Sequence, residues 1–368
     1  VGAEGGFSVQ FQHHAVVQEK VQGQDRIRVY DFAKRDWHAV TFPEALYTAG
    51  LSVNPEFETN TVRLSYQSMV TPASTYDYDM TTRTRTLLKQ QEVLGGYDPA
   101  RYETKRVWFT ARDGVKVPLS IVHRKGIALD GTNPLWLYGY GSYGFGQSPT
   151  FSTARLSLLD RGVIWATAHI RGGNELGEAW HDDGMLMKKK NTFHDFIDAA
   201  DFLVQQRWTG RDRLVIQGGS AGGLLVGAVV NFRPDLCRAA HAAVPFMDVL
   251  NTMMDRSLPL TTGEYLEWGN PNEKAAFDYM WSYSPYDNLK RTAYPAMLVT
   301  TGLNDSQVMY WEPAKYVAKL RTLKTDTNPL LLKVNLGAGH GGASGRYDAL
   351  KERAFEYAWM LSQLGITK

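Results

Sequence analysis

The 368-residue sequence contains a single cysteine, Cys237, so an internal disulfide is excluded. It has no run of about 18 apolar residues, the length that a membrane-spanning helix requires. It also has little net charge, because it contains 40 basic and 38 acidic residues. Such a balanced charge does not attract the chain to nucleic acid or to an anionic membrane. We therefore expect no nucleic-acid or membrane partner, and a cytoplasmic location, where a lone cysteine stays reduced.

Residues 1–90 show short alternating patterns of apolar and polar residues, separated by polar turns. Such patterns predict β-strands joined by hairpins. The segment Tyr30–Arg35 resembles Tyr78–Arg83, 48 residues further on. That period is typical of the four-stranded blades of a β-propeller, although two copies cannot close a ring. An ordinary antiparallel sheet is the alternative.

From about residue 98 the pattern changes to near-continuous apolar strands alternating with helical periodicity, after a hairpin around Asp113-Gly114. The expected strands are 134–141, 162–170, 213–217, 238–246, 296–302 and 330–336, and the expected helices are 192–206, 311–324 and 348–364. Thr192 is the expected N-cap of the first helix, and Lys188–Lys190 a solvated turn before it. This alternation predicts an α/β fold with a parallel sheet covered on both faces.

The stretch VIQGGSAGG places one serine, Ser220, between a strand pattern and an apolar helical run. Gly218 and Gly222 fit the Gly-x-Ser-x-Gly nucleophile elbow, with Gly219 and Gly223 adding room in a sharp turn. The alternatives are a tight turn and a phosphate-binding loop, but the latter lacks its Gly-Lys-Ser/Thr ending. The flanking strand and helix favour the elbow.

A serine nucleophile needs a base, which in turn needs a carboxylate to orient it. Asp305 and His340 follow Ser220 in the order that hydrolases with this elbow use, each in the loop after an expected strand. Loops at the carboxyl ends of parallel strands carry the sites of open α/β sheets. His241, inside an expected core strand, and His194, near a helix start, are the weaker candidates for the base.

The oxyanion of a tetrahedral intermediate needs hydrogen-bond donors. The backbone amide of Ala221, directly after the serine, is one candidate. The loop YGYGSYGFG (138–146) follows an early strand, and one of its tyrosine hydroxyls is the other. The alternative is a glycine-aromatic loop that packs on the core.

Several motifs together resemble the prolyl oligopeptidase family of serine peptidases: YGYGSYG, RLSLLDRGVIWATAHIRGGNELG, QGGSAGG, TTGE-x-x-EWGNP, YSPYDN and GHGG. Within that family the sequence is most similar to the oligopeptidase B branch, which cleaves short peptides after Arg or Lys. The resemblance implies an α/β-hydrolase catalytic domain over 98–368. It also implies that 1–90 are the C-terminal blades of the propeller that caps this domain.

By position, the resemblance assigns Ser220 as the nucleophile, Asp305 as the orienting acid and His340 as the base. It assigns Tyr140 as the oxyanion donor, Glu264 as the carboxylate for the basic P1 side chain and Phe246 as an aromatic wall of the P1 pocket. A carboxylate is the natural partner of an arginine fork, and an apolar wall suits the arginine stem.

The sequence departs from some members of the family at three positions. Leu266 stands where they carry a second glutamate, two residues after Glu264. Ser148 and Thr150 stand where they carry two aspartates that favour a basic P2 residue. We therefore expect Arg or Lys at P1, weaker discrimination there, and little demand for a basic P2 residue.

These observations predict a serine oligopeptidase whose partners are short peptides with Arg or Lys at P1, without a cofactor or a metal. Two alternatives stay open. One is a peptidase or esterase of the same fold with another P1 specificity, and the other is a non-catalytic propeller–hydrolase interaction module. The sequence begins at Val1 rather than at methionine. We therefore expect a fragment or a processed product, and a second polypeptide is a possible source of the remaining blades.

Overall fold

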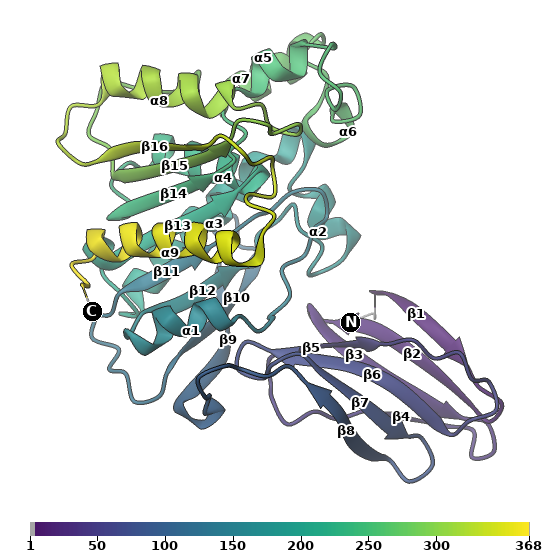
Figure 1. Cartoon of the computed structure of the whole chain (residues 1–368). Helices are drawn as coiled ribbons and strands as arrows, with labels where there is room; N and C mark the ends of the chain where they lie inside the picture. Colours follow the sequence, from purple (N-terminus) through teal and green to yellow (C-terminus); the bar gives the residue numbers. More distant parts are fainter. Residues whose placement is uncertain (1–3, 368) are drawn as a thin grey trace.

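The computed structural model describes residues 4–367 and contains three sheets (Figure 1). Two of them are four-stranded and antiparallel, each built from consecutive strands. The first contains β1 (Glu4–Gln10), β2 (His14–Val21), β3 (Gln24–Asp31) and β4 (Asp36–Ala39), and the second contains β5 (Tyr47–Leu51), β6 (Thr61–Ser68), β7 (Ser74–Asp79) and β8 (Thr84–Gln90). The N-terminal strands thus form two separate blade-like sheets, as the repeat predicts, rather than one ordinary sheet.

The turns β3–β4 and β7–β8 show that the repeat is structural. In the first, Asp31 Oδ1 accepts hydrogen bonds from the two amides of Ala33 and Lys34, both at 3.0 Å. In the second, Asp79 Oδ1 accepts from the two amides at the equivalent positions, both at 2.8 Å. An aspartate at the equivalent position therefore closes the equivalent turn in both sheets.

The third sheet has eight strands in the order β16-β15-β14-β13-β11-β12-β10-β9. Its strands are β9 (Tyr102–Thr110), β10 (Lys116–Arg124), β11 (Leu135–Tyr138), β12 (Ile164–Ala168), β13 (Leu214–Gly219), β14 (Ala239–Ala243), β15 (Ala296–Gly302) and β16 (Leu330–Asn335). The pairs β9–β10 and β10–β12 are antiparallel, and the remaining pairs are parallel. The expected hairpin and the six expected strands of the parallel sheet are all present.

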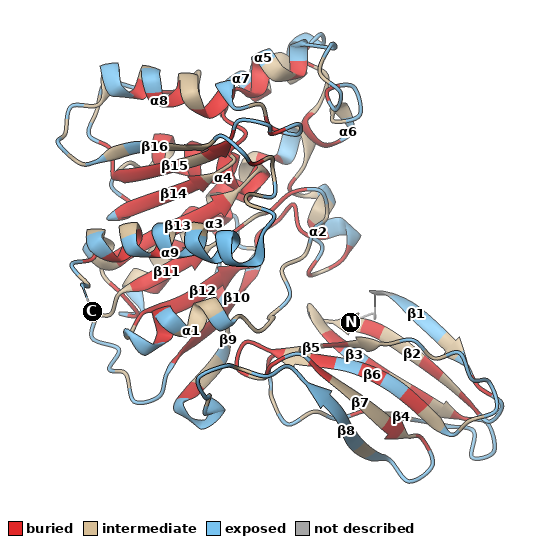
Figure 2. Cartoon of the chain, viewed as in Figure 1, coloured by how far each residue is buried: buried red, intermediate tan, exposed pale blue. Residues whose placement is uncertain are grey.

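Helices cover both faces of this sheet, and its central strands are buried (Figure 2). One face packs against α1 (Thr153–Asp160) and α9 (Arg346–Gln363). The other packs against α3 (Lys190–Gln205), α4 (Ala221–Phe232) and α8 (Trp311–Leu323). The shorter segments are η1 (Pro99–Arg101), α2 (Glu178–Asp182), η2 (Leu186–Lys188), η3 (Arg211–Arg213), α5 (Val249–Met254), α6 (Tyr265–Trp268) and α7 (Lys274–Trp281). Among the helices of residues 4–367, none is both long and apolar enough to cross a membrane.

The start of α3 differs from the expectation. The helix begins at Lys190, and Thr192 lies inside its first turn, where its hydroxyl donates to the carbonyl of Arg171 at 2.8 Å. Thr192 is therefore not an N-cap. Lys189, expected in a solvated turn, is 1 % exposed. Three carbonyl or hydroxyl oxygens accept hydrogen bonds from its ammonium group, which a sequence pattern does not reveal.

Candidate active site

Ser220 lies at the turn between β13, which ends at Gly219, and α4, which begins at Ala221. Its φ is +59°, in the left-handed region that residues other than glycine seldom adopt. The amide of Ser220 donates to the carbonyl of Ala243 on the next strand at 2.8 Å, which helps to hold this conformation. The geometry is that of a strained strand-to-helix elbow, in which the serine is half-buried.

The glycines of the elbow differ in how strictly the fold requires them. A Cβ on Gly218 would overlap the carbonyl of Gly222, and a Cβ on Gly223 would overlap Pro245. A Cβ on Gly219 would meet nothing closer than 3.6 Å, an ordinary contact. The expectation that Gly219 is needed for room is therefore wrong, whereas that for Gly223 is confirmed.

Asp305 and His340 are hydrogen-bonded, with 2.8 Å between Asp305 Oδ2 and His340 Nδ1. The other oxygen of Asp305 accepts from the amides of Gln307 and Val308, both at 2.9 Å. Burial favours the neutral acid, but the hydrogen bonds from His340 and from the two amides outweigh it and lower the pKa of Asp305. An ionised Asp305 keeps the proton on Nδ1 of the imidazole, which leaves Nε2 free to act as a base.

The serine and the histidine line different cavities. His340 lines a cavity of about 510 Å³ together with Gly219, and Ser220 lines one of about 330 Å³ together with Ala221. Among the residues that the structure describes, no hydrogen bond joins the Ser220 hydroxyl to His340. The acid–base pair is thus formed, while the contact between base and nucleophile stays a prediction.

Two groups near Ser220 can donate to an oxyanion. The amide of Ala221, the first residue of α4, has no partner within its helix. Tyr140 lines the same cavity as the serine. Burial raises the pKa of Tyr140 to about 12, so its hydroxyl keeps the proton that it would donate.

Glu264 lies in the same cavity as Ser220, and two aromatic side chains fix its carboxylate. Its Oε2 accepts from the Tyr143 hydroxyl at 2.6 Å and from Trp268 Nε1 at 2.8 Å. Phe246, 7 % exposed, lines the cavity with its ring 5.4 Å from that of Trp268. The structure therefore brings Glu264 and Phe246 together. The sequence-based prediction gave no role to Tyr143 or Trp268, although they belong to the motifs YGYGSYG and EWGNP.

The three departing positions fall outside the Glu264 cavity. Leu266 is 81 % exposed and does not line it. Ser148 and Thr150 line the larger cavity that also contains His340. A residue at position 266 therefore projects into solvent, and Ser148 and Thr150 share their cavity with the base rather than with Glu264.

The other candidate bases are unsuited to the reaction. His241 on β14 is fully buried, and its ring nitrogens lie within hydrogen-bond distance of Gln217 Nε2 and Thr300 Oγ1, each at 3.1 Å. Burial lowers the pKa of His241 to about 3. His194 lies on α3 with its ring 6.1 Å from that of Phe232, the last residue of α4, and burial lowers its pKa as well.

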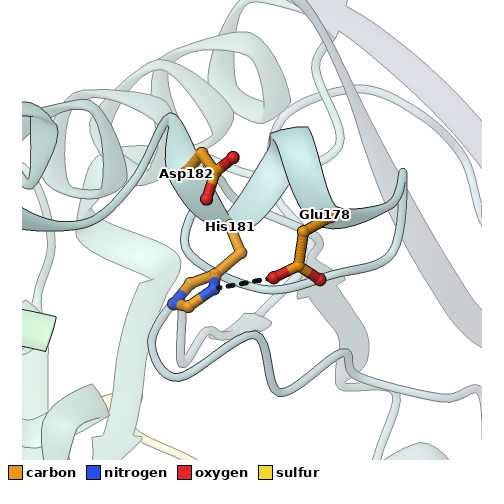
Figure 3. A group of neighbouring side chains, drawn as sticks. All are labelled: Glu178, His181 and Asp182. Atoms are coloured by element: carbon orange, nitrogen blue, oxygen red, sulfur yellow. Dashed lines mark ion pairs between the residues drawn. The ribbon is translucent and has the colours of Figure 1, made fainter. Parts of the chain in front are cut away.

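One group of possible metal ligands occurs on α2, formed by Glu178, His181 and Asp182 (Figure 3). The ligand atoms all lie within 4.8 Å of one another. His181 Nδ1 is 3.9 Å from Glu178, but its Nε2 is hydrogen-bonded to Glu267 at 2.7 Å. Because both acids are exposed and nothing further points to a ligand, we assign no metal to this group.

Comparison with known proteins decides the family. The sequence model of the prolyl oligopeptidase family matches residues 149–367, and that of the prolyl oligopeptidase N-terminal β-propeller domain matches residues 7–91. The chain belongs to the prolyl oligopeptidase family. The predicted fold, an α/β-hydrolase domain preceded by propeller blades, is confirmed.

Similar members of the prolyl oligopeptidase family include dipeptidyl aminopeptidase BI of Pseudoxanthomonas mexicana, which is 52 % identical over 98 % of this chain and 50 % of its own. Protease 2 of Moraxella lacunata is 46 % identical over 89 % of this chain and 47 % of its own. The structure resembles oligopeptidase B from Leishmania major, with a TM-score of 0.90 at 44 % identity over 98 % of this chain and 51 % of that one. Oligopeptidase B from Trypanosoma brucei with covalently bound antipain gives 0.91 at 44 % identity over 98 % and 52 %. The chain thus spans about half the length of these relatives.

Proposed function

We propose that this chain carries the catalytic site of a serine oligopeptidase that cleaves short peptides after Arg or Lys. The observation that carries the proposal is the half-buried carboxylate of Glu264 in the same cavity as Ser220. The Asp305–His340 hydrogen bond and the strained elbow support the catalytic half of the proposal. The relatives named oligopeptidase B support the choice of substrate.

In the proposed mechanism, the Ser220 hydroxyl oxygen attacks the scissile carbonyl carbon and passes its proton to Nε2 of His340. The oxyanion receives hydrogen bonds from Tyr140 and from the amide of Ala221. His340 then returns the proton to the leaving amine, and the peptide C–N bond breaks. A water molecule then passes a proton to His340 and attacks the acyl carbon. The ester bond to Ser220 breaks as His340 returns the proton to the Ser220 oxygen, and Asp305 stabilises the imidazolium in both steps.

The pocket is suited to a basic side chain. Glu264 Oε2 already accepts two hydrogen bonds, whereas Oε1 accepts none among the described residues. A cation on a long apolar stem can therefore reach Oε1 while its stem packs on Phe246. A cavity of about 330 Å³ has room for one such side chain.

A second candidate function is the release of N-terminal dipeptides, because one similar relative is named a dipeptidyl aminopeptidase. Peptides with a free or an acetylated N-terminus, and otherwise the same sequence, separate the two functions. Strong preference for the free amine would favour the dipeptidyl aminopeptidase activity. Peptides with and without a basic P2 residue, assayed alongside, test the expectation that Ser148 and Thr150 impose no P2 requirement.

The test of P1 specificity compares Glu264→Gln with Leu266→Ala on fluorogenic peptides with Arg, Lys, Pro or Ala at P1, and on a short-chain ester. We expect Glu264→Gln to reduce kcat/KM about 10- to 100-fold for the Arg and Lys peptides only, since a buried cation loses its charged partner. Leu266→Ala, the exposed control, leaves all the rates within about twofold. A wild-type preference for Pro or Ala, or for the ester, would refute the assignment of Glu264.

Labelling with a fluorophosphonate tests the nucleophile, with Ser220→Ala as the control. A label on wild type that Ser220→Ala abolishes supports catalysis, and no label on a folded preparation favours the interaction module. The native mass of that preparation tests whether a second polypeptide supplies further blades. The cytoplasmic location stays a prediction, which cell fractionation tests.

A further inference from the structure

A second carboxylate, that of Glu267, lies beside the candidate P1 pocket and has no part in the mechanism above. It lies in α6, three residues after Glu264, and is 5 % exposed. A buried carboxylate requires partners, because burial without hydrogen bonds or a counter-charge is costly. Glu267 has three such partners, from three separate segments of the chain.

The first partner is the backbone of the loop 138–146, which carries the proposed oxyanion donor Tyr140. Glu267 Oε1 accepts a hydrogen bond from the amide of Tyr143 at 2.9 Å. Tyr143 has a φ of +60°, an unfavourable conformation for a residue that is not glycine. The carboxylate therefore helps to hold a strained residue three positions after the proposed oxyanion donor, Tyr140.

The other partners are two cationic or potentially cationic side chains. His181 Nε2 is hydrogen-bonded to Glu267 Oε2 at 2.7 Å, and the ammonium of Lys189 lies 3.7 Å from Oε1. Burial, which Glu267 opposes, lowers the pKa of Lys189 to about 8. Lys189 also lies over the ring of Trp268, 5.0 Å from its centroid.

Lys189 extends the network along the same loop. Its ammonium donates to the carbonyl of Gly141 at 2.6 Å and to the hydroxyl of Ser142 at 2.8 Å. Three consecutive residues of the loop, Gly141, Ser142 and Tyr143, are thus bonded to Lys189 or Glu267. The Tyr143 hydroxyl donates in turn to Glu264. The amide of Tyr143 is therefore bonded to Glu267 in α6, and its hydroxyl to Glu264 directly before that helix.

We propose that Glu267 is a positioning residue that, with Lys189, fixes the loop of Tyr140 and Tyr143 against α6 and so sets the oxyanion donor and the P1 carboxylate together. The proposal rests on the proposed function of the same site. Glu267 acts through Tyr143 and does not touch the substrate. Its loss therefore affects substrates with any P1 side chain, whereas the loss of Glu264 affects only basic ones.

The first experiment measures kcat and KM of Glu267→Ala and Glu264→Gln on matched peptides with Arg or Ala at P1, with active sites counted by fluorophosphonate titration. We expect Glu267→Ala to lower kcat per active site about 10- to 100-fold on both peptides, because the oxyanion donor is displaced. Glu264→Gln lowers kcat/KM on the Arg peptide alone. Counting active sites removes the contribution of misfolded protein.

The second experiment compares Glu267→Gln with Glu267→Asp, and it decides the matter if Glu267→Ala does not fold. Glutamine keeps the length and an acceptor for the Tyr143 amide but loses the charge. Aspartate keeps the charge but is one methylene shorter. A positioning role predicts that Glu267→Gln retains kcat within about threefold, while Glu267→Asp loses more than tenfold.

Two results would overturn the inference: an unchanged kcat per active site in Glu267→Ala, or a higher kcat in Glu267→Asp than in Glu267→Gln. Neither bears on P1 specificity. Conversely, an unaltered Arg preference in Glu264→Gln would refute the proposed specificity and leave the kcat comparison at Glu267 intact. The two failures are therefore distinguishable.

Discussion

Two buried carboxylates near the candidate site have pKa values displaced in opposite directions. Burial favours the neutral form of Asp305, but the hydrogen bond from His340 and those from two amides outweigh it and lower the pKa. Burial also favours the neutral form of Glu312, which accepts from Thr252 and from the amides of Met247 and Asp248. These hydrogen bonds do not offset burial, and the pKa of Glu312 rises to about 8. Asp305 accepts a hydrogen bond from the His340 ring, whereas among the described residues Glu312 accepts only from a hydroxyl and two amides.

This difference gives a prediction on stability and pH. The folded-state pKa of Glu312, about 8, exceeds the ordinary value of 4.5, so the folded state binds more protons between these limits. The free energy of unfolding therefore decreases as the pH rises from about 4.5 to about 8, because the buried carboxyl of Glu312 then has to ionise. Glutamine at position 312 is neutral at every pH. We therefore expect the difference in melting temperature, Glu312→Gln minus wild type, to increase by several degrees between pH 5 and pH 8.

The control in these thermal unfolding experiments is Glu273→Gln, which removes an exposed carboxylate. We expect its difference from wild type to stay flat across the same range. A flat difference for Glu312→Gln as well would mean that burial does not raise the pKa of this residue.

At the scale of elements, the elbow between β13 and α4 depends on close packing against Pro245. A Cβ on Gly223 would overlap Pro245, whereas a Cβ on Gly219 would make only ordinary contacts. We therefore expect Gly223→Ala to lower the free energy of unfolding by about 1–3 kcal/mol and to slow fluorophosphonate labelling, because α4 must shift. Thermal unfolding and labelling rates measure the two effects.

Gly219→Ala is the matched control, since it adds the same methyl group on the other side of Ser220. We expect it to change the stability by less than about 1 kcal/mol. Equal losses in the two variants would show that the packing against Pro245 is not what requires a glycine.

Most elements could be predicted from the sequence because their signals are local. Apolar runs bounded by glycine or polar residues predicted β13 and β15, and helical periodicity predicted α8 and α9. The order of Ser220, Asp305 and His340 was sufficient to predict the Asp305–His340 pair, since a parallel sheet brings the ends of its strands to one edge.

The partners of Lys189 could not be predicted in this way. A run of three lysines is typical of a solvated turn, and the oxygens that accept from Lys189 belong to residues 141, 142 and 184. Nothing local in the sequence indicates that these segments meet. The same holds for Glu267, whose three partners come from three different segments. Burial of charge depends on tertiary contacts, which periodicity does not encode.

At the scale of the whole molecule, the first sheet contacts the hydrolase through its β2–β3 turn. Arg106 Nη2 donates to the carbonyl of Gln22 at 3.2 Å. Gly23 has a φ of +74°, and a Cβ there would lie 2.7 Å from Arg106 Nη2 and 2.9 Å from the carbonyl oxygen of Glu175. The turn therefore fits against the hydrolase only with glycine at this position.

We expect Gly23→Ala to loosen the contact between the first sheet and the hydrolase. Gly114→Ala is the control, because its φ of +88° imposes a similar backbone strain with no atom within 4 Å of the added methyl group. Hydrogen exchange in the β2–β3 turn, and limited proteolysis between residues 91 and 98, should increase in Gly23→Ala alone. Equal increases in both variants would assign the effect to strain in the turns.

Each N-terminal sheet is completed by four consecutive strands, and an aspartate at the equivalent position, Asp31 or Asp79, closes its last turn. No strand of one sheet is borrowed from the other among residues 4–90. Such a unit can be duplicated, deleted or exchanged as a block without rethreading the rest of the chain. The number of such sheets attached to the hydrolase could thus change in evolution, or by engineering, one whole sheet at a time.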